Sequence, residues 1–566
     1  MRRAVSNVPT QVSTVSLAAP LASTRHATTW EWLVVVALPV LAMATIHLPA
    51  MSSALAIAPG DEGDARIMVF LLESMMRGLL AGGHNVLSPG MFFPVRGVLS
   101  YTDAHLLWLP LYAAFRTLGL EPVRAFAGLM LTLLLYGYAT FWLLMRRALG
   151  LRPAPAAVGA TLFVFGNALT VKLIHGQMIG VTVLPTILLL LHQAWHRQRW
   201  WAGIAAGLLI GALAATSFIV TWTFLLFAAG AGLIGLAVIP AFRHGLLGRE
   251  GRAPFLGTLT GLAIGIVPFA YIYHGQILYG QRRPWQNIFF YHPYLSDLLD
   301  LGERNALYSP LLKHVGIPVV PSEIIAERFF GSSPPVWLLC LAGAVLVAAG
   351  WRGANGAARA LLLGFVATAV VTFAEFPYGT WWPWRLVLNL PGASAIRTPF
   401  RTEIVALVPI CALAALALDR VVRLRRVGSA LFLTLSAAAL LESAFAEAPY
   451  RLRAADEHAL LAGIPHPPSG CRVFAITPQP PGRIWWQIQD DSLVLALHWH
   501  LPTINGNNSW YPDDWGGLKD PMAPGYGQAL ATWIKNHALR NEVCLYDEAA
   551  QRWLAADEVQ PLAGQG

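Results

Sequence analysis

The chain has 566 residues, of which 56% are hydrophobic and only 12% are charged, and its formal net charge is +9. Soluble globular domains carry about 25% charged residues, so a surface that faces water throughout is excluded. The basic residues lie in short loops between apolar runs, and the sequence holds no Gly-rich phosphate loop and no zinc-type Cys/His spacing. These features argue against a nucleic-acid-binding or nucleotide-binding protein.

Apolar runs follow one another along most of the chain, after a Ser/Thr-rich segment, 1–29, that is predicted to be a disordered cytoplasmic tail. Lipid offers no partner to backbone N–H and C=O groups, so each run is predicted to be a helix. The segment 104–118 is predicted to be a helix that lies in, or dips into, the membrane interface. We predict about eleven spans, at residues 32–57, 123–145, 156–171, 178–195, 201–217, 218–239, 254–273, 335–349, 358–376, 404–418 and 429–445.

The arginines set the predicted orientation. With the N-terminus in the cytoplasm, every predicted inner loop holds at least two arginines, and the short outer loops hold few. The predicted fold is therefore an all-α polytopic membrane domain at 30–446, N-in and C-out, followed by a small α/β domain at 447–566 on the outer face. In that domain, 472–477 and 492–497 alternate as strands do. Function is expected to concentrate on the long outer loops 58–121, 274–334 and 377–402.

The four cysteines fall into two pairs. Cys340 and Cys411 lie inside apolar runs and are interpreted as small core residues. Cys471 and Cys544 both lie in the C-terminal domain, where an oxidising compartment would allow a disulfide. Two unpaired buried thiols fit the spacing equally well.

Three carboxylates stand within four residues directly after the first predicted span: Asp61, Glu62 and Asp64. A carboxylate there could accept a proton from a substrate hydroxyl or hold a divalent cation against a phosphate. The alternative is a solvated acidic turn in which Asp64 is the N-cap of a helix that begins at Ala65.

Other polar residues are expected on the same side of the membrane. Asp103 is a candidate helix N-cap, and His105 beside it is a candidate proton carrier. Lys172, His175 and Gln177 lie at the outer end of the third predicted helix and would suit a polar cavity that faces the acids. The Phe-Phe-Pro triplet at 92–94 is interpreted as an interfacial anchor.

Arg397 and Arg401 precede a predicted span on its outer side, against the positive-inside bias. A guanidinium binds phosphate oxygens in a bidentate manner, so a lipid phosphate or pyrophosphate is a suitable partner. Pairing with Glu403 or with the acidic loop is the alternative. Arg282 and Arg283 in the second outer loop are weaker candidates of the same kind.

The order of these motifs resembles a bacterial subfamily of the GT-C superfamily of membrane glycosyltransferases, which depend on polyprenyl-phosphate sugars. No single motif is specific. The resemblance depends on the order of the motifs along the chain and on their predicted position on one side of the membrane. The resemblance rests on Gly-Asp-Ala-Arg at 63–66 with Leu-Glu at 72–73, Phe-Pro at 93–94, Tyr-Thr-Asp at 101–103, His-Gly-Gln-Met at 175–178, Arg-Thr-Pro-Phe-Arg at 397–401, Leu-Pro-Thr-Ile-Asn-Gly at 501–506 and Trp-Tyr-Pro at 510–512.

The resemblance implies an enzyme of the bacterial inner membrane that moves a sugar from a polyprenyl-phosphate donor to a glycan, lipid or protein acceptor outside the cytoplasm. Asp64 fits the base best, and Asp61 remains the alternative. Some members use a divalent metal such as Mg²⁺ or Mn²⁺ and others do not.

The remaining site residues take supporting roles in this hypothesis. Arg397 and Arg401 hold the leaving phosphate, and His175 and Gln177 line the donor cavity. Glu62, Asp103 and His105 order the first loop or touch substrate, and the second outer loop is a candidate lid.

Two rival functions use the same features. A transporter or flippase of lipid-linked glycans also needs spans, basic lipid contacts and a polar cavity, but it predicts charged residues at mid-span depth. The predicted spans are largely uncharged in their middles, and the polar groups gather on one side. That distribution favours an enzyme. An envelope assembly protein whose C-terminal domain binds a partner is the third hypothesis.

Overall fold

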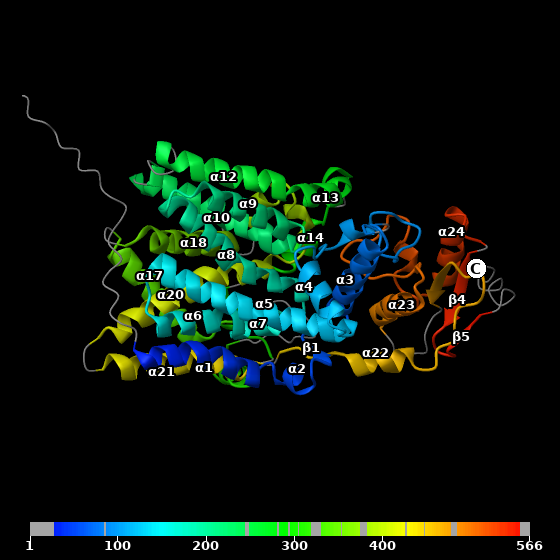
Figure 1. Cartoon of the computed structure of the whole chain (residues 1–566), viewed down its shortest axis with the longest axis horizontal. Helices are drawn as coiled ribbons and strands as arrows, with labels where there is room; N and C mark the ends of the chain where they lie inside the picture. The colour runs from blue at the N-terminus through cyan, green and yellow to red at the C-terminus, as the bar shows by residue number, and fades with distance from the viewer. Residues whose placement is uncertain are drawn as a thin grey trace, which may run out of the picture.

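A computed structural model describes residues 28–554 except 84–85, 241, 244–247, 280–281, 293–294, 304, 318–329, 352–353, 374–381, 425–426, 447, 477–483 and 541. Nearly all of the predicted N-terminal tail lies outside the described residues. Figure 1 shows a long bundle of helices with a smaller C-terminal unit packed against one end of it.

Each predicted span has a helical counterpart at the same place in the chain. The long helices are α1 (Thr29–Thr45), α5 (Pro122–Leu144), α6 (Pro153–Phe165), α8 (Leu184–His196), α9 (Trp200–Ala214), α10 (Phe218–Val238), α12 (Arg249–Gly265), α17 (Pro334–Ala349), α18 (Gly356–Phe373), α20 (Glu403–Val422) and α21 (Gly428–Ala444).

Other helices join them or extend them: α2 (Leu48–Ser52), α3 (Asp64–Leu80), α4 (Leu109–Thr117), α7 (Asn167–Lys172), α13 (Val267–Tyr279), α14 (Trp285–Phe289), α15 (Tyr308–His314) and α19 (Trp384–Val387). Helical turns of other pitch are η1 (Val98–Tyr101), η2 (Met145–Leu149), η3 (Gly176–Val183), η4 (Leu295–Leu299), η5 (Ala393–Ala395) and η6 (Pro399–Thr402). The interfacial helix predicted at 104–118 is α4, which has 9 residues and is therefore too short to cross a core that needs about 20.

In the part of the chain that the structure describes, 5 helical segments are long and apolar enough to cross a membrane, or 6 if one bent pair is a single span. That pair, Gly251–Gly265 and Val267–Ile277, is bent by 61°. Shorter apolar helices, namely α1, α9, α17, α18 and α21, stand at the other predicted spans. The chain is thus a helical membrane protein, and the count of eleven spans stays a prediction.

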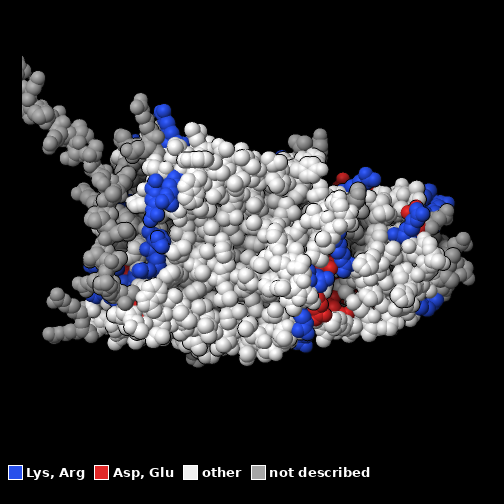
Figure 2. Space-filling model, viewed as in Figure 1, with Lys and Arg blue, Asp and Glu red and all other residues white. Residues whose placement is uncertain are grey.

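The predicted inner loops meet at one end of the bundle. Arg152 pairs with Glu31 at the start of α1 (Nη2–Oε2 2.8 Å), and its backbone N–H donates to Asp419 near the end of α20 at 2.8 Å. On the face drawn in Figure 2, lysines and arginines form a band at one end, and a wide uncharged zone separates them from charges beside the C-terminal unit. An uncharged zone of this kind is what contact with lipid tails requires.

Small residues allow α9 and α12 to pack closely. A Cβ added at Gly207 would lie 2.2 Å from the Thr258 oxygen, and one at Gly261 would lie 2.0 Å from the Ile204 oxygen. Glycines at such contacts let helix backbones approach, which is how helices associate in lipid.

The C-terminal unit contains β2 (Leu452–Arg453), α22 (Ala454–Leu461), β3 (Val473–Ile476), α23 (Trp485–Trp499), η7 (Gly516–Leu518), α24 (Tyr526–Asn536), β4 (Val543–Asp547) and β5 (Arg552–Trp553). Its sheet has the order β3-β4-β5, with β3 parallel and β5 antiparallel to β4. A disulfide joins Cys471 to Cys544, with the Cα atoms 5.7 Å apart, and so ties the start of β3 to β4.

The strand-like interpretation of 492–497 is wrong, because this segment lies inside α23. Buried positions in α23 include Ile488, Ser492 and Leu495, which recur at helical spacing once the whole helix is considered. A segment of six residues is too short to distinguish the alternation of a strand from the spacing of a helix.

The first predicted outer loop, 58–121, packs into the C-terminal unit. The backbone N–H of Phe92 donates to the Asn505 oxygen at 3.1 Å, and that of Thr503 donates to the Gly90 oxygen at 2.7 Å. The Phe92 ring is fully buried, with its centroid 4.8 Å from that of Trp515. Phe92 is therefore not an interfacial anchor: the prediction missed that its backbone pairs with a segment of the C-terminal unit.

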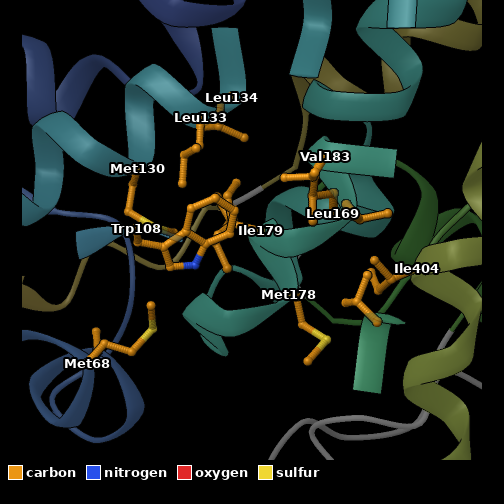
Figure 3. Packing of buried hydrophobic residues seen from close by; sticks show 14 of the residues in the cluster. Met68, Trp108, Met130, Leu133, Leu134, Leu169, Met178, Ile179, Val183 and Ile404 are labelled. Carbon is orange, nitrogen blue, oxygen red and sulfur yellow. The ribbon is translucent and has the colours of Figure 1, made fainter. Parts of the chain in front are cut away.

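An apolar core lies in the bundle near the end that contacts the C-terminal unit (Figure 1 and Figure 3). Figure 3 shows Met68 of α3, Met130 of α5, Met178 and Ile179 of η3, and Ile404 of α20 around it. These residues are all buried. The core therefore holds in place the segments from which the site described next is built.

Candidate active site

The acidic loop is held rigidly at the start of α3. β1 (Ile57–Ala58) pairs antiparallel with β2, and the Gly60 N–H donates to the Pro449 oxygen at 2.6 Å. Gly60 has a φ of +126°, and a Cβ there would lie 2.5 Å from that of Ala65. Only glycine fits this turn without strain, so the backbone itself orients the acids.

Asp61, and not Asp64, caps α3. The Asp61 Oδ1 accepts hydrogen bonds from the backbone N–H groups of Gly63 (3.1 Å) and Ala65 (3.5 Å). Asp64 is the first residue of the helix, so the interpretation of Asp64 as an N-cap before Ala65 is wrong. Because Asp61 satisfies the helix end, the Asp64 carboxylate is left available, and its side chain is 38% exposed.

Asp64 is hydrogen-bonded to two of the three residues predicted to face the acids, and the third, Lys172, pairs with Glu403 instead. His175 Nδ1 lies 2.7 Å from Asp64 Oδ2, and Gln177 Nε2 donates to the same oxygen at 3.4 Å. Since a carboxylate only accepts, the Nδ1–H of His175 is the donor. Burial acts to raise the pKa of Asp64, but the hydrogen bond and charge of His175, with the charge of Arg401, hold it below its ordinary value. The Asp64 carboxylate is therefore ionised at neutral pH.

The pKa of the neighbouring acid, Asp61, is shifted in the opposite direction. Burial, together with the negative charge of Asp64, raises the pKa of Asp61 to about 6. Two carboxyl groups whose pKa values are pushed apart in this way are suited to different tasks. Asp61 is a cap that gains a proton readily, and Asp64 is a carboxylate that keeps its charge.

Three guanidinium groups from two predicted outer loops, 274–334 and 377–402, gather beside these acids. Arg401, in η6, is close enough to lower the pKa of both Asp64 and Asp103. Arg397 lies 5.6 Å from the ring of Tyr291, and its charge, after burial, lowers the pKa of Arg283 to about 10. Like charges gathered in this way favour the binding of an anion.

Arg283 also links the second predicted outer loop to the C-terminal unit. Its Nη2 donates to the Ser509 oxygen at 3.0 Å, and its guanidinium lies 4.2 Å from the Trp510 ring. Sequence reasoning ranked Arg283 with Arg282 as a weaker candidate. In the structure Arg282 is exposed, whereas Arg283 belongs to the cluster.

Asp103 is a cap, but for a distant helix. Its Oδ1 accepts from the backbone N–H of Phe218 at 2.7 Å, at the start of α10. The expectation that Asp103 caps its own helix is wrong, because α4 begins only at Leu109. Burial raises the pKa of Asp103 to about 6. Buried His105 has its pKa lowered to about 4 by desolvation, so its ring is neutral at pH 7 and its role as a proton carrier stays a prediction.

A second set of residues, which sequence reasoning missed, clamps α3 to the C-terminal unit. Arg66 Nη1 lies 2.6 Å from Asp491 Oδ1 on α23, and its Nε lies 2.6 Å from Glu457 Oε1 on α22. Glu62 lies close enough to Glu457 to raise its pKa, after burial. The available signal was an arginine followed directly by the apolar residues 67–72, since a charge that must be buried requires a partner.

Lys172 and Glu403 form a buried ion pair between α7 and the start of α20. Glu403 therefore does not pair with Arg397 or Arg401, which was one of the two alternatives considered for them. The other alternative, pairing with the acidic loop, agrees with the effect of the Arg401 charge on the pKa of Asp64. The Lys172 carbonyl accepts from the His175 N–H at 2.9 Å, and Arg401 stands two residues before Glu403. The ion pair thus links the segment that carries His175 with the segment that carries Arg401, and both residues act on Asp64.

Replacing Lys172 with methionine is expected to destabilise the protein by about 3–5 kcal/mol, because it leaves the Glu403 charge buried and unpaired. The double variant Lys172→Met/Glu403→Met should recover most of the loss. Thermal unfolding in detergent measures both. Lys313→Met is the matched control, since its partner Glu303 is 3.6 Å away in an exposed pair. Equal effects of the two single variants would contradict the structural role of the buried pair.

No group of three or more His, Cys, Asp or Glu side chains among the described residues is placed to hold a metal ion. Asp61 Oδ1 is engaged by backbone amides and Asp64 Oδ2 by His175. One oxygen of each acid is thus already engaged, and metal dependence stays a prediction. Two surface hollows of about 310 and 570 Å³ lie beside α24 and beside α1, and neither is lined by Asp64 or Arg401. The site is therefore defined by its side-chain contacts.

Comparisons with known proteins give structural matches only. No family model matches the sequence, and no curated protein matches it. The structure is similar to that of the arabinofuranosyltransferase AftD from Mycobacteria, with a TM-score of 0.50 and 14% identity, covering 94% of this chain and 37% of that one. The chain has the GT-C fold.

Two structures of the oligosaccharyltransferase of Archaeoglobus fulgidus are also similar. The apo form matches with a TM-score of 0.46 and 13% identity, covering 91% of this chain and 69% of that one. The form of AglB in complex with an inhibitory peptide and a dolichol-phosphate matches with a TM-score of 0.44 and 13% identity, covering 92% and 69%. The present chain spans little more than a third of AftD, so the likeness concerns the GT-C fold and not the whole activity of that enzyme.

Proposed function

We propose that this GT-C chain transfers a sugar from a polyprenyl-phosphate donor to an acceptor of the cell envelope, at the periplasmic face of the bacterial inner membrane. The observation that carries the proposal is the Asp64 carboxylate, held by hydrogen bonds from His175 and Gln177 and within electrostatic reach of the Arg401 guanidinium. Glycosyl transfer from a phosphate requires a carboxylate that accepts the acceptor's proton and a cation that stabilises the leaving phosphate. The first predicted outer loop supplies the carboxylate, and the third supplies the guanidinium.

The proposed reaction is a single displacement that inverts the anomeric carbon. The acceptor oxygen forms a bond to that carbon as the bond from carbon to the phosphate oxygen breaks. Asp64 takes the proton of the acceptor hydroxyl, and the polyprenyl phosphate leaves with the bonding electron pair. Arg401, with Arg397 and Arg283, stabilises the negative charge that develops on the phosphate. His175 and Gln177 orient Asp64.

The proposed topology has about eleven spans, the N-terminus inside and the C-terminal domain, from residue 447, outside. It is supported by the pairing of the predicted inner segments at one end of the bundle, where Arg152 meets Glu31 and Asp419. It is supported at the other end by the predicted outer residues Asp64, His175 and Arg401, which share one site.

The test is an assay in membrane vesicles with a panel of radiolabelled polyprenyl-phosphate hexoses and pentoses. We expect release of polyprenyl phosphate together with transfer of label to an envelope fraction. Movement of the intact labelled lipid across the bilayer, without cleavage of the sugar–phosphate bond, would establish the flippase instead.

The pH dependence of transfer identifies the base. A base must be deprotonated, so activity is lost as the pH falls through its pKa. With Asp64 as base, whose pKa lies below its ordinary value of 3.8, the rate should remain near its maximum at pH 5. With Asp61 as base, the rate should fall by half near pH 6. The Asp61→Asn variant keeps a capping oxygen and should show the wild-type profile. Loss of activity in this variant with a stable fold would assign the base to Asp61.

A further inference from the structure

α23 presents an aromatic ring and a carboxyl group toward the acidic loop. Trp486 and Asp490 are four residues apart and therefore lie on one face of the helix. A Cβ placed on Gly63 would lie 3.6 Å from the Trp486 ring, so the ring lies over the acidic turn. Asp490 is fully buried, and its surroundings include the charges of Asp61 and Asp64. This face of α23 therefore forms a wall of the proposed active site.

Two buried polar atoms have no hydrogen-bond partner among the described residues: Asp490 Oδ1 on this wall, and Nδ2 of Asn508, which follows the Asp490 partner Asn507 in the chain. The other Asp490 oxygen accepts from Asn507 Nδ2 at 3.3 Å, and the Asn508 side-chain oxygen accepts from the Ser509 N–H at 3.1 Å. A buried polar atom without a partner carries a penalty of about 1–3 kcal/mol, which a ligand group can remove. A sugar hydroxyl suits both atoms, because it donates and accepts.

Tyr511 connects this wall to the guanidinium cluster. Its hydroxyl donates to Asn507 Oδ1 at 3.2 Å. Burial raises the pKa of Tyr511 to about 12, and Asp490 acts in the same direction while Arg397 and Arg283 oppose it. The tyrosine is thus within electrostatic reach of both the guanidinium cluster and Asp490. In a displacement reaction, the transferred group lies between the leaving phosphate and the base.

We propose that Asp490 and Asn508, with Trp486 above the acidic turn, bind the hydroxyl groups of the glycosyl unit carried by the lipid donor. The C-terminal unit is then the part of the protein that selects the sugar. This inference rests on the proposed glycosyl transfer. The Asn- and aromatic-rich segment near residue 510 thereby gains a role in sugar binding, beside the residues that bind phosphate or act as the base.

Binding of two lipids to the purified full chain in detergent separates the possibilities. The probes are polyprenyl phosphate and the polyprenyl-phosphate monosaccharide from the panel that is transferred fastest. Asp490→Asn and Asn508→Ala should each weaken binding of the sugar-bearing lipid by about 10-fold or more and leave binding of polyprenyl phosphate unchanged. Arg401→Gln should weaken binding of both. Asp513→Asn, an exposed acid in the same segment, is the matched control.

Each other outcome overturns a distinct claim. Equal weakening of both lipids by Asp490→Asn and Asn508→Ala, or unchanged binding of both, overturns sugar recognition by this wall. Thermal unfolding identifies a variant that merely fails to fold, and the remaining variant then decides. A wild-type chain that binds polyprenyl phosphate but transfers no sugar overturns the proposed function itself.

Discussion

Replacing Asp64 with asparagine is expected to lower the rate of glycosyl transfer by about 10²–10⁴-fold, the contribution typical of a positioned general base. The variant keeps the size of the side chain and an oxygen that can accept from His175 and Gln177, which now contact Asp64 at 2.7 and 3.4 Å. It removes the charge that draws the acceptor proton. The measurement is the initial rate at saturating labelled donor in membrane vesicles, compared with wild type.

Two further measurements make the Asp64 result specific. Donor binding should change little, so kcat falls with KM nearly constant. Asp61→Asn should retain most of the activity, because Asp61 Oδ1 caps the backbone of Gly63 and Ala65 and an asparagine oxygen can do the same. An Asp64→Asn protein that folds normally and transfers sugar at the wild-type rate would remove this carboxylate from the chemistry.

Arg401→Gln is expected to lower kcat/KM by about 10²–10³-fold, the range seen when one preorganised donor to a developing negative charge is removed. The reason is the place of Arg401 beside Asp64 and Asp103, in the short turn that precedes α20. Arg401→Lys should recover only part of the rate, because lysine keeps the charge but cannot bind phosphate oxygens in a bidentate manner. Donor titrations of the three proteins give the ratio.

The matched control for Arg401 is Arg282→Gln. Arg282 is an exposed arginine next to Arg283 in the second outer loop, and its loss should change the rate by less than about twofold, as surface charges that are screened by solvent do. Equal losses at the two positions would show that Arg401 acts through the general positive potential and not through contact with the leaving phosphate.

The sequence by itself determined the helices and the residue types of the site. Runs such as 123–145 and 404–418 leave no alternative to helix in lipid, and the structure has α5 and α20 there. Asp64, His175 and Gln177 were expected to face one another, and they share a hydrogen-bonded contact. Both results rest on properties of short segments: the length of an apolar run, and which end of it bears polar groups.

Only the tertiary structure decided which distant residues are partners. Asp103 caps a helix that begins at Phe218, and Arg66 reaches Asp491. Phe92, expected at the membrane surface, is buried in the C-terminal unit, and Glu403 belongs to Lys172. A capping oxygen, an aromatic ring or a carboxylate has the same local signature whether its partner is near or hundreds of residues away. The choice depends on how the loops close and which charges must be buried together, which no local pattern records.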